Sequence, residues 1–279
     1  MVTCKFCSSQ NLVKYGKRGN VQYYLCRACG HTFAGNNTLP GMRFAPEHIA
    51  ASIHMFYDGL SIDALRKQLR NKYNIYPSDS TVHKWIVHFT EVAANLAKDL
   101  NVHVGDFWIV GETALKIYND KYIWLWDIMD DETRFLLASR IPVGRTMQNS
   151  RQLMSRAVKA AGHTPKIINL DKEKAFLDGI EIVFGAETSD LQPAEFAFKP
   201  NNNRIERFHT ILEDRSIILR RMKNRETAKL VMEGWLVHYN FFRPQKELNN
   251  KTPGETAKAT FPYQSWQELI IGANLIDVS

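Results

Sequence analysis

Four cysteines near the amino terminus have the residue type and the spacing of a metal site. They form two Cys-x-x-Cys pairs, Cys4 with Cys7 and Cys26 with Cys29, separated by eighteen residues. This is the spacing of a four-thiolate zinc site, in which each pair turns two sulfurs toward one tetrahedral ion. A module of this size buries too little apolar surface to fold alone, so metal binding would supply its folding free energy. We therefore expect a zinc ribbon over residues 1–40 with structural Zn²⁺; two disulfides in a secreted domain are the alternative.

Basic side chains are the second group with chemical consequences. The chain carries a formal net charge of +7 at pH 7, and residues 1–40 contain five Lys or Arg and no Asp or Glu. A second basic stretch runs from Arg204 to Arg225. A phosphate backbone is the commonest partner of such surfaces, which favours double-stranded DNA. Solvated helix faces are the alternative for either stretch.

Residues 41–100 have the pattern of three helices. Pro46 begins the first helix, and Ser61 caps the second. Ser78 or Asp79 caps the third, whose small polar and basic residues face outward near its start. This arrangement predicts a helix-turn-helix domain that places its last helix in the major groove of DNA. An ordinary helical spacer between two domains is the alternative.

Residues 101–225 change to the alternating pattern of strands and predict an α/β core. The expected elements are strands at Phe107–Tyr118, Lys121–Met129 and Thr133–Val143, a helix at Thr146–Ala161, strands at Lys166–Leu170 and Ile180–Phe184, and a helix from about Asn202. This order is that of a ribonuclease-H-like core with a mixed sheet, in which three antiparallel strands are followed by parallel ones. Residues 226–279 are expected to form a C-terminal helical segment that packs on this core.

Several short motifs give this order a specific resemblance. The sequence resembles the DDE transposases of insertion sequences at Trp108 to Thr113, at Asp171 and at Asn202 to His209. Among these transposases, it is most similar to an insertion-sequence-six-like group and its archaeal relatives. His238 to Pro244 and Thr252 to Glu255 are similar to the closing signature of that family. The resemblance covers nearly the whole chain. It implies a ribonuclease-H-like fold and DNA transposition as the activity of the family.

The resemblance also implies a two-metal cutting site. In that family, Mg²⁺ or Mn²⁺ ions held by carboxylates clamp the attacking and leaving oxygens of an in-line phosphodiester displacement. Carried over to this chain, two of the three carboxylates are Asp171 and Glu206, with 34 residues between them. The first Asp of the family corresponds to Gly111, which supplies no oxygen. We therefore expect weakened metal binding and impaired or absent cleavage.

Neighbouring acids are candidates to replace the missing carboxylate. Glu112 and Asp106 lie at odd offsets from Gly111, and successive side chains of a strand point to opposite faces, which disfavours both.

Glu213 stands where the family usually has Lys or Arg, and Gln245 stands where it has His. Natural drift and a laboratory substitution both remain explanations of the glycine. Gly111→Asp is expected to restore metal binding if the rest of the pocket is intact.

The residues expected to contact DNA are basic or small polar side chains from three of these segments. They are Lys5, Lys14, Lys17, Arg18, Arg66, Lys67, Arg70, Ser80, Thr81, His83, Lys84, Arg204, Arg207 and Arg215. The preferred hypothesis is a transposase-derived protein that binds terminal-repeat-like double-stranded DNA as a homodimer, with little or no cleavage. A working transposase completed by another acid, and a protein-interaction scaffold built on the zinc ribbon, are the alternatives.

Features of other protein classes are missing from the sequence. It contains no run of eighteen apolar residues and no secretory signal pattern. We therefore expect no membrane partner and a cytoplasmic, nucleoid-associated prokaryotic protein. The sequence also has no Gly-rich phosphate loop and no nucleophile triad, so no small-molecule substrate is expected.

Overall fold

A computed structural model describes the chain at residues 2–98, 100–116, 122–142, 146–170, 195–197, 203–214 and 225–276. Contacts divide the chain into two compact units. Unit 1 comprises Met1–Met55, Ile62–Phe89 and Tyr263–Ser279, and unit 2 comprises Phe56–Ser61 and Thr90–Pro262. Within the described ranges, no helix is both long enough and apolar enough to cross a membrane.

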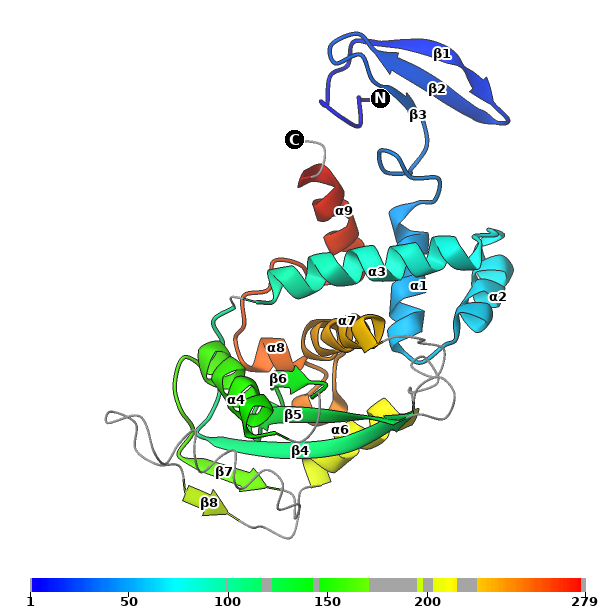
Figure 1. Cartoon of the computed structure of the whole chain (residues 1–279). Helices are drawn as coiled ribbons and strands as arrows, with labels where there is room; N and C mark the ends of the chain where they lie inside the picture. Colours follow the sequence, from blue (N-terminus) through cyan, green and yellow to red (C-terminus); the bar gives the residue numbers. More distant parts are fainter. Residues whose placement is uncertain are drawn as a thin grey trace. The chain divides into compact units, whose positions relative to one another are not determined.

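A three-stranded antiparallel sheet forms the amino-terminal part of unit 1 (Figure 1). β1 (Leu12–Arg18) pairs with β2 (Val21–Cys26), and β2 pairs with β3 (Thr32–Ala34). Two of the cysteines and Phe33 form the buried core of this sheet. Three buried side chains are too few to stabilise a fold by apolar burial alone, which agrees with a module that depends on its cysteines.

Three helices follow the sheet, with starts close to those expected from the sequence. They are α1 (Pro46–Tyr57), α2 (Ile62–Tyr73) and α3 (Asp79–Leu96). Each buries apolar side chains at helical spacing, including Ile49 and Ile53, Leu65 and Leu69, and Val82, Ile86 and Phe89. By its contacts α9 (Trp266–Ile276) also belongs to unit 1. Only the residues before Tyr263 are therefore grouped with the core, in contrast to the expectation for residues 226–279.

Unit 2 contains a five-stranded mixed sheet with the strand order β6-β5-β4-β7-β8. The strands are β4 (Phe107–Lys116), β5 (Tyr122–Asp130), β6 (Leu136–Arg140), β7 (Ile167–Leu170) and β8 (Glu195–Ala197). β4, β5 and β6 form an antiparallel meander, whereas β7 runs parallel to β4 and β8 runs parallel to β7. This is the topology expected of a ribonuclease-H-like core. The strand expected at Ile180–Phe184 lies outside the described residues, and the described β8 follows it in the chain.

Helices lie on both faces of this sheet (Figure 1). α4 (Met147–Ala161) lies on one face and α6 (Asn203–Asp214) on the other. Side chains alternate between these faces along each strand. Arg140 of β6 donates from Nη2 to Oδ1 of Asn149 on α4 at 3.0 Å, whereas Thr113 of β4 donates to a carboxylate on α6. The face of β4 that carries Thr113 is therefore the face on which α6 packs.

The first closing motif forms an unusual turn that supports the edge strand β6. α7 (Arg225–Val237) continues into a π-helical turn at His238–Phe242, and all five residues of this turn are buried. Within it, Asn240 Oδ1 accepts a hydrogen bond from the backbone N–H of Leu136 at 3.0 Å. Asn240 Nδ2 donates to the carbonyl of the same Leu136 at 2.9 Å. One amide side chain thus satisfies both backbone groups at the start of β6.

The second closing motif is a helix start. The hydroxyl of Thr252 accepts from the backbone N–H of Glu255 at 3.1 Å, and the Glu255 carboxylate accepts from the N–H of Thr252 at 2.7 Å. This capping box begins the short helix α8 (Pro253–Thr256). Both closing motifs therefore have structural roles in unit 2.

Asn240→Ala is expected to lower the free energy of unfolding of unit 2 by about 2–4 kcal/mol, because it leaves a buried donor and a buried acceptor of Leu136 without partners. Urea unfolding followed by circular dichroism measures the change. The control is Asn95→Ala, which removes an exposed asparagine of α3 and is expected to change stability by less than about 0.5 kcal/mol. Equal losses in the two variants would show that the Asn240 bonds contribute nothing specific.

Candidate functional site

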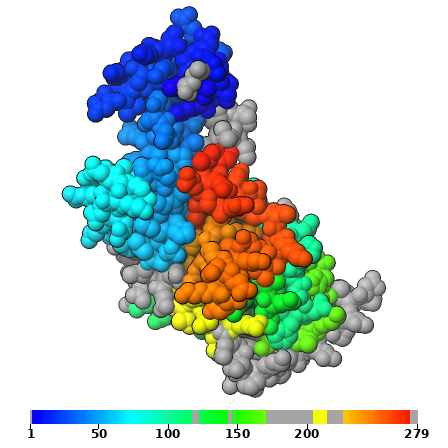
Figure 2. All heavy atoms as spheres, turned by 180° about the vertical axis from the view of Figure 1, so that it is seen from behind, coloured from blue at the N-terminus to red at the C-terminus, as the bar shows by residue number. Residues whose placement is uncertain are grey.

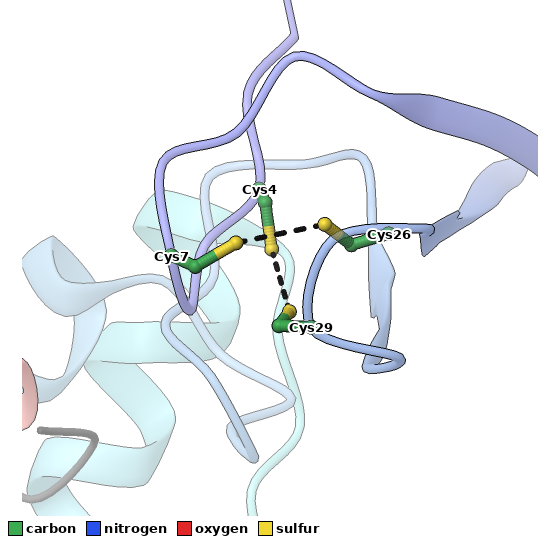
Figure 3. A group of neighbouring side chains, drawn as sticks. All are labelled: Cys4, Cys7, Cys26 and Cys29. Atoms are coloured by element: carbon green, nitrogen blue, oxygen red, sulfur yellow. Dashed lines mark hydrogen bonds between the residues drawn. The ribbon is translucent and has the colours of Figure 1, made fainter.

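The four cysteine sulfurs converge on one point (Figure 3). The Sγ atoms of Cys4 and Cys29 lie 3.6 Å apart, as do those of Cys7 and Cys26, and all four sulfurs lie within 4.8 Å of one another. Four Zn–S bonds of about 2.3 Å in a tetrahedron give sulfur–sulfur distances of about 3.8 Å. A disulfide requires about 2.05 Å. The arrangement therefore suits one metal ion shared by four thiolates, and it does not suit two disulfides.

The loop that carries Cys26 favours an ionised sulfur at that position, whereas contacts among the clustered thiols and burial raise the pKa of Cys7 to about 12 and also raise that of Cys29. Burial of the Cys26 sulfur opposes ionisation, but hydrogen bonds from the backbone amides of Cys29 and Ala28 outweigh it and lower the pKa of the thiol to about 6. The thiolate is the form that binds metal. A closed set of four thiolates is the ligand set of a structural zinc site, which has no open position for a substrate. The chemistry of these donors thus fits Zn²⁺.

The basic residues of the ribbon fall into two groups. The ammonium of Lys5 donates to the carbonyl of Thr38 at 2.5 Å and to Oδ1 of Asn36 at 3.2 Å, and burial lowers its pKa. Lys5, which the sequence places among the DNA contacts, therefore binds the end of its own module. The remaining expected contacts of this module are exposed on β1, namely Lys14, Lys17 and Arg18.

Most of the residues expected at the start of α3 are accessible. Ser80, His83 and Lys84 are exposed, and Thr81 is half-buried. The hydroxyl of Ser78 accepts a hydrogen bond from the backbone N–H of Thr81 at 3.2 Å, so the helix start is capped by a side chain as expected. The start of α3 therefore has the exposure that a DNA-reading helix requires.

The basic residues of α2 do not all face solvent. Lys67 and Arg70 are exposed, and the Arg70 guanidinium lies 5.3 Å from the ring centre of Tyr76. Arg66 instead donates from Nε to the carbonyl of Pro77 at 2.8 Å and forms an ion pair with Asp79. Its role in the described structure is to hold the turn between α2 and α3.

The two carboxylates expected at the cutting site are placed only in part. Glu206 is exposed in the first turn of α6. Asp171 lies outside the described residues. The residue before it, Leu170 of β7, pairs with Val110 of β4, which is the neighbour of Gly111 in the chain. Among the residues that the structure describes, the four cysteines are the only group of three or more metal-binding side chains close enough to hold an ion. The described part of the core thus contains no such group, and Asp171 is not among the residues searched.

Gly111 lies within β4 with α6 packed directly on it. A Cβ at this position would lie 2.7 Å from Cε1 of His209 and 2.8 Å from Cδ1 of Ile205. Both of these side chains are buried. Because protein interiors are close-packed, any side chain at position 111 must displace one or both of them. The space beside Gly111, where the family resemblance predicts the first carboxylate, is therefore filled by side chains of α6.

A buried polar cluster lies beside Gly111 on the same face of the sheet. Asp127 pairs with Gly111 across the two strands and is fully buried. Nε2 of His209 lies 3.1 Å from Asp127 Oδ2, and the hydroxyl of Ser139 donates to Asp127 Oδ1. Protein groups thus engage both carboxylate oxygens, which is how a buried carboxylate is stabilised without an ion. The cluster joins α6 to β5 and β6 across the glycine.

Neither acid considered as a replacement lies at this place. Glu112 pairs with Trp126 and projects from the opposite face of the sheet to Gly111. Asp106 precedes β4, and Lys166 Nζ lies 2.6 Å from its Oδ2. This hydrogen bond and the positive charge of Lys166 lower the pKa of Asp106. Asp106 is thus paired at the beginning of β7, away from the face of Gly111.

Glu213, which the family resemblance predicts to stand in place of a basic residue, forms a hydrogen bond to the sheet. Its Oε1 accepts a hydrogen bond from the hydroxyl of Thr113 at 2.6 Å. Glu213, His209 and Ile205 are spaced four residues apart, so one stripe of α6 faces β4: Ile205 and His209 lie beside Gly111, and Glu213 is bonded to Thr113. Glu213 therefore adds a hydrogen bond between α6 and β4 close to this place.

Two of the three expected DNA contacts near α6 are paired with acids of unit 2. Arg204 forms an ion pair with Asp131 at 2.6 Å, and Arg207 forms one with Glu247 at 2.7 Å. Figure 2 shows the surface of α6 in yellow beside the orange surface of the segment that carries Glu247. Ion pairs that are largely accessible to solvent, as these are, contribute little stability. Arg215 lies outside the described residues.

The residues around Gly111 were mostly not recognisable as a site from the sequence. Ile205 and His209 stand within a motif quoted above, but nothing in the motif shows that they contact position 111. Asp127 carries the one usable signal, because it is a lone acid inside an apolar strand, and such an acid must be satisfied if it is buried. Ser139 carries no signal.

The strand order and the helices on both faces are those of a ribonuclease-H-like core. A family model described as a DDE domain matches residues 105–245, just over half of the chain. The chain belongs to this DDE family of transposases and integrases. A comparison with curated proteins gives no match.

Solved structures similar to this chain include retroviral integrases. The HTLV-2 integrase catalytic core domain in complex with magnesium, in its trimeric form, is 14% identical with a TM-score of 0.42, over 56% of this chain and 99% of that chain. The dimeric form of the same domain is 14% identical with a TM-score of 0.41, over 56% of this chain and 97% of that chain. A chain of the simian T-cell lymphotropic virus intasome, in complex with PP2A regulatory subunit B56 gamma, is 14% identical with a TM-score of 0.42. The match covers 77% of this chain and 77% of that chain.

Proposed function

We propose that this chain is a transposase-derived DNA-binding protein of the insertion-sequence-six-like group, with little or no strand-cutting activity. It binds terminal-repeat-like double-stranded DNA as a homodimer, through its amino-terminal ribbon and the helix-turn-helix of α1 to α3. Zn²⁺ held by the four cysteines has a structural role. Membership of the DDE family supports DNA as the partner.

The observation that carries the impaired activity is the packing at Gly111. Cutting by two metal ions requires carboxylate oxygens at fixed positions, and glycine supplies none. The space in which a carboxylate would stand is filled by Ile205 and His209. Asp127, the described acid on this face of β5, has both oxygens engaged by Ser139 and His209. The described residues therefore do not fit the pair of Mg²⁺ or Mn²⁺ ions that the family implies.

Two exposed surfaces support the DNA-binding part of the proposal. The basic residues of β1 have no Asp or Glu before Glu47 with which to pair. At the start of α3, Ser80, His83 and Lys84 are exposed on a capped helix, which is the position from which a recognition helix contacts base edges.

The test combines binding and cutting of the same DNA. Zinc-loaded full-length chain is mixed with a duplex that carries a candidate terminal repeat, and with a scrambled duplex of equal length. Gel shift measures binding, and denaturing gels measure strand cleavage with Mg²⁺ or Mn²⁺. We expect binding that weakens steeply with salt, and no cleavage above the level of a chain with Glu206→Gln.

Either part of the proposal can fail separately. Metal-dependent cleavage that Glu206→Gln removes would show an active transposase in which another acid has replaced the missing one. Absence of binding to any duplex at low salt would overturn the DNA-binding function and favour a protein-interaction scaffold. Light scattering of the free chain and of the complex measures the predicted homodimer.

A further inference from the structure

The free end of the β1–β2 hairpin carries a cluster of basic and aromatic side chains. Every residue from Lys14 to Arg18 is exposed, and the side chain of Tyr15 is 63% exposed. β3 pairs only with Tyr23 to Leu25 of β2, so beyond Tyr23 the hairpin is two-stranded (Figure 1). A narrow, charged ribbon of two strands therefore extends from the cysteine-bound part of the module.

A β-bulge determines where these charges point. Lys14 lies opposite Tyr24, and Lys17 lies opposite Gln22. Between these two pairs, β1 advances by three residues and β2 by only two, so β1 contains one extra residue. Without the extra residue, Lys14 and Lys17 would point to opposite faces. With it, they lie on the same face as Gln22 and Tyr24. The bulge thus gathers two lysines on one side of the hairpin.

A backbone conformation and a hydrogen bond stabilise the β-bulge in β1. Gly16 adopts a φ of +102°, which residues with a side chain rarely adopt. The side-chain amide of Gln22 donates to the carbonyl of Gly16 at 2.7 Å. A glycine and a glutamine on opposite strands therefore stabilise the register that brings the two lysines together.

The opposite face of the hairpin carries the third cation. Arg18 lies opposite Val21, and its guanidinium carbon lies 4.8 Å from the ring centre of Tyr23. This stacking restricts the long side chain on that face and leaves its N–H groups directed to solvent. The tip therefore has positive charge on both faces, with Tyr15 exposed at the bulge.

A two-stranded ribbon with cations on both faces fits the major groove of B-DNA. That groove is about 12 Å wide, admits a two-stranded β-ribbon, and is bordered by phosphates on both sides. The major groove of A-form RNA is too narrow and deep for such an element. No Asp or Glu precedes Glu47, so no carboxylate of the ribbon competes with phosphate for these cations.

We propose that the tip of this hairpin inserts into the major groove of double-stranded DNA, with Lys14 and Lys17 contacting one phosphate backbone and Arg18 the other. Tyr15 contacts base edges or sugars between them. The proposal rests on the DNA-binding function proposed above and assigns it to one edge of the ribbon. Lys5 and Arg27 take no part, because Lys5 is bound to Thr38 and Arg27 lies outside the hairpin tip.

The central comparison in the experiment is between two variants that each remove one positive charge from the same module. Full-length, zinc-loaded Lys17→Gln is compared with Arg27→Gln, which removes one exposed cation outside the hairpin. The triple variant Lys14→Gln, Lys17→Gln, Arg18→Gln and the single variant Tyr15→Ala complete the set. Zinc content and circular dichroism establish that each variant is folded. Binding to a candidate end duplex is measured from low to high salt.

Lys17→Gln is expected to reduce the slope of log affinity against log salt by about 0.9, and the triple variant by about 2.7, whereas Arg27→Gln leaves it unchanged. The triple variant is expected to bind roughly 10- to 100-fold more weakly. Dimethyl sulfate, which modifies guanine N7 in the major groove, should reveal protected guanines that the triple variant exposes.

The outcomes separate this proposal from the proposed function. If the parent chain binds no duplex, the DNA-binding function itself fails. If the parent binds and the hairpin variants behave like Arg27→Gln, the ribbon tip is not the contact and the wider function stands. Affinity for an RNA duplex equal to that for DNA, or unchanged protection of guanine N7 in the triple variant, would overturn the placement in the major groove.

Discussion

Removal of zinc is expected to unfold the amino-terminal ribbon while unit 2 keeps its fold. The buried apolar core of the described ribbon consists of Cys4, Cys26 and Phe33, with a few partly buried side chains packed against it, so apolar burial contributes little to its stability. Binding of Zn²⁺ by four thiolates provides about 10–16 kcal/mol in modules of this kind, far more than any single contact of the chain. Chelation, or Cys4→Ser, should therefore abolish the amide dispersion of residues 1–40 in NMR spectra and weaken DNA binding.

The control for this experiment is Thr32→Ser, which alters an exposed residue of the same small sheet and leaves the thiolates in place. It should retain one zinc per chain by elemental analysis. Co²⁺ in place of Zn²⁺ should give the absorption of tetrahedral thiolate coordination. A ribbon that stays folded in chelator, with its mass lowered by the hydrogens lost in disulfide formation, would show two disulfides and contradict the zinc site.

Gly111→Asp is expected to destabilise unit 2 and to leave cleavage absent. The new side chain meets Ile205 and His209 at distances below 3.0 Å, and overpacking of this kind costs about 1–3 kcal/mol. Its charge would also lie directly opposite the buried Asp127, which adds like-charge repulsion. A total loss of about 2–4 kcal/mol lowers the melting temperature by roughly 5–15 °C. Calorimetry measures this change with and without Mn²⁺.

Gly111→Asn is the matched control, because asparagine has the size of aspartate without its charge. We expect both variants to melt below the parent, the aspartate variant lower, and Mn²⁺ to shift neither. Gly111→Asp combined with Ile205→Ala should recover part of the loss, since the smaller side chain makes room. A melting temperature that Mn²⁺ raises for Gly111→Asp alone would show a metal site that lacks only its first carboxylate. That is the result expected from the sequence before the packing of α6 is known.

Local patterns account for the elements that the sequence predicts well. Pro46, Ser61 and the polar residues before α3 mark helix starts, because the backbone groups that they satisfy lie within one turn. The two cysteine pairs predict their cluster because each knuckle is local and only one hairpin must close. The strand order of the core follows from the succession of alternating apolar segments. These features, and the family resemblance, are set by residues close together in the chain.

Contacts between distant residues decided the rest. The sequence shows that position 111 lacks a carboxylate, but only the structure shows that Ile205 and His209 fill its place. The sequence counts Lys5 among the cations of the ribbon, and the fold binds it to Thr38. Asn240 satisfies a strand residue 104 positions away.

Thus the sequence by itself determined the class of protein and the cluster of four cysteines, and it predicted a missing carboxylate at Gly111, because these depend on residue type and short spacing. The tertiary structure decided whether there is free space beside Gly111, and which cations of the ribbon are exposed. Those outcomes depend on which side chains meet when helices and strands pack, and a buried volume or ion pair can be made by residues at any separation in the chain.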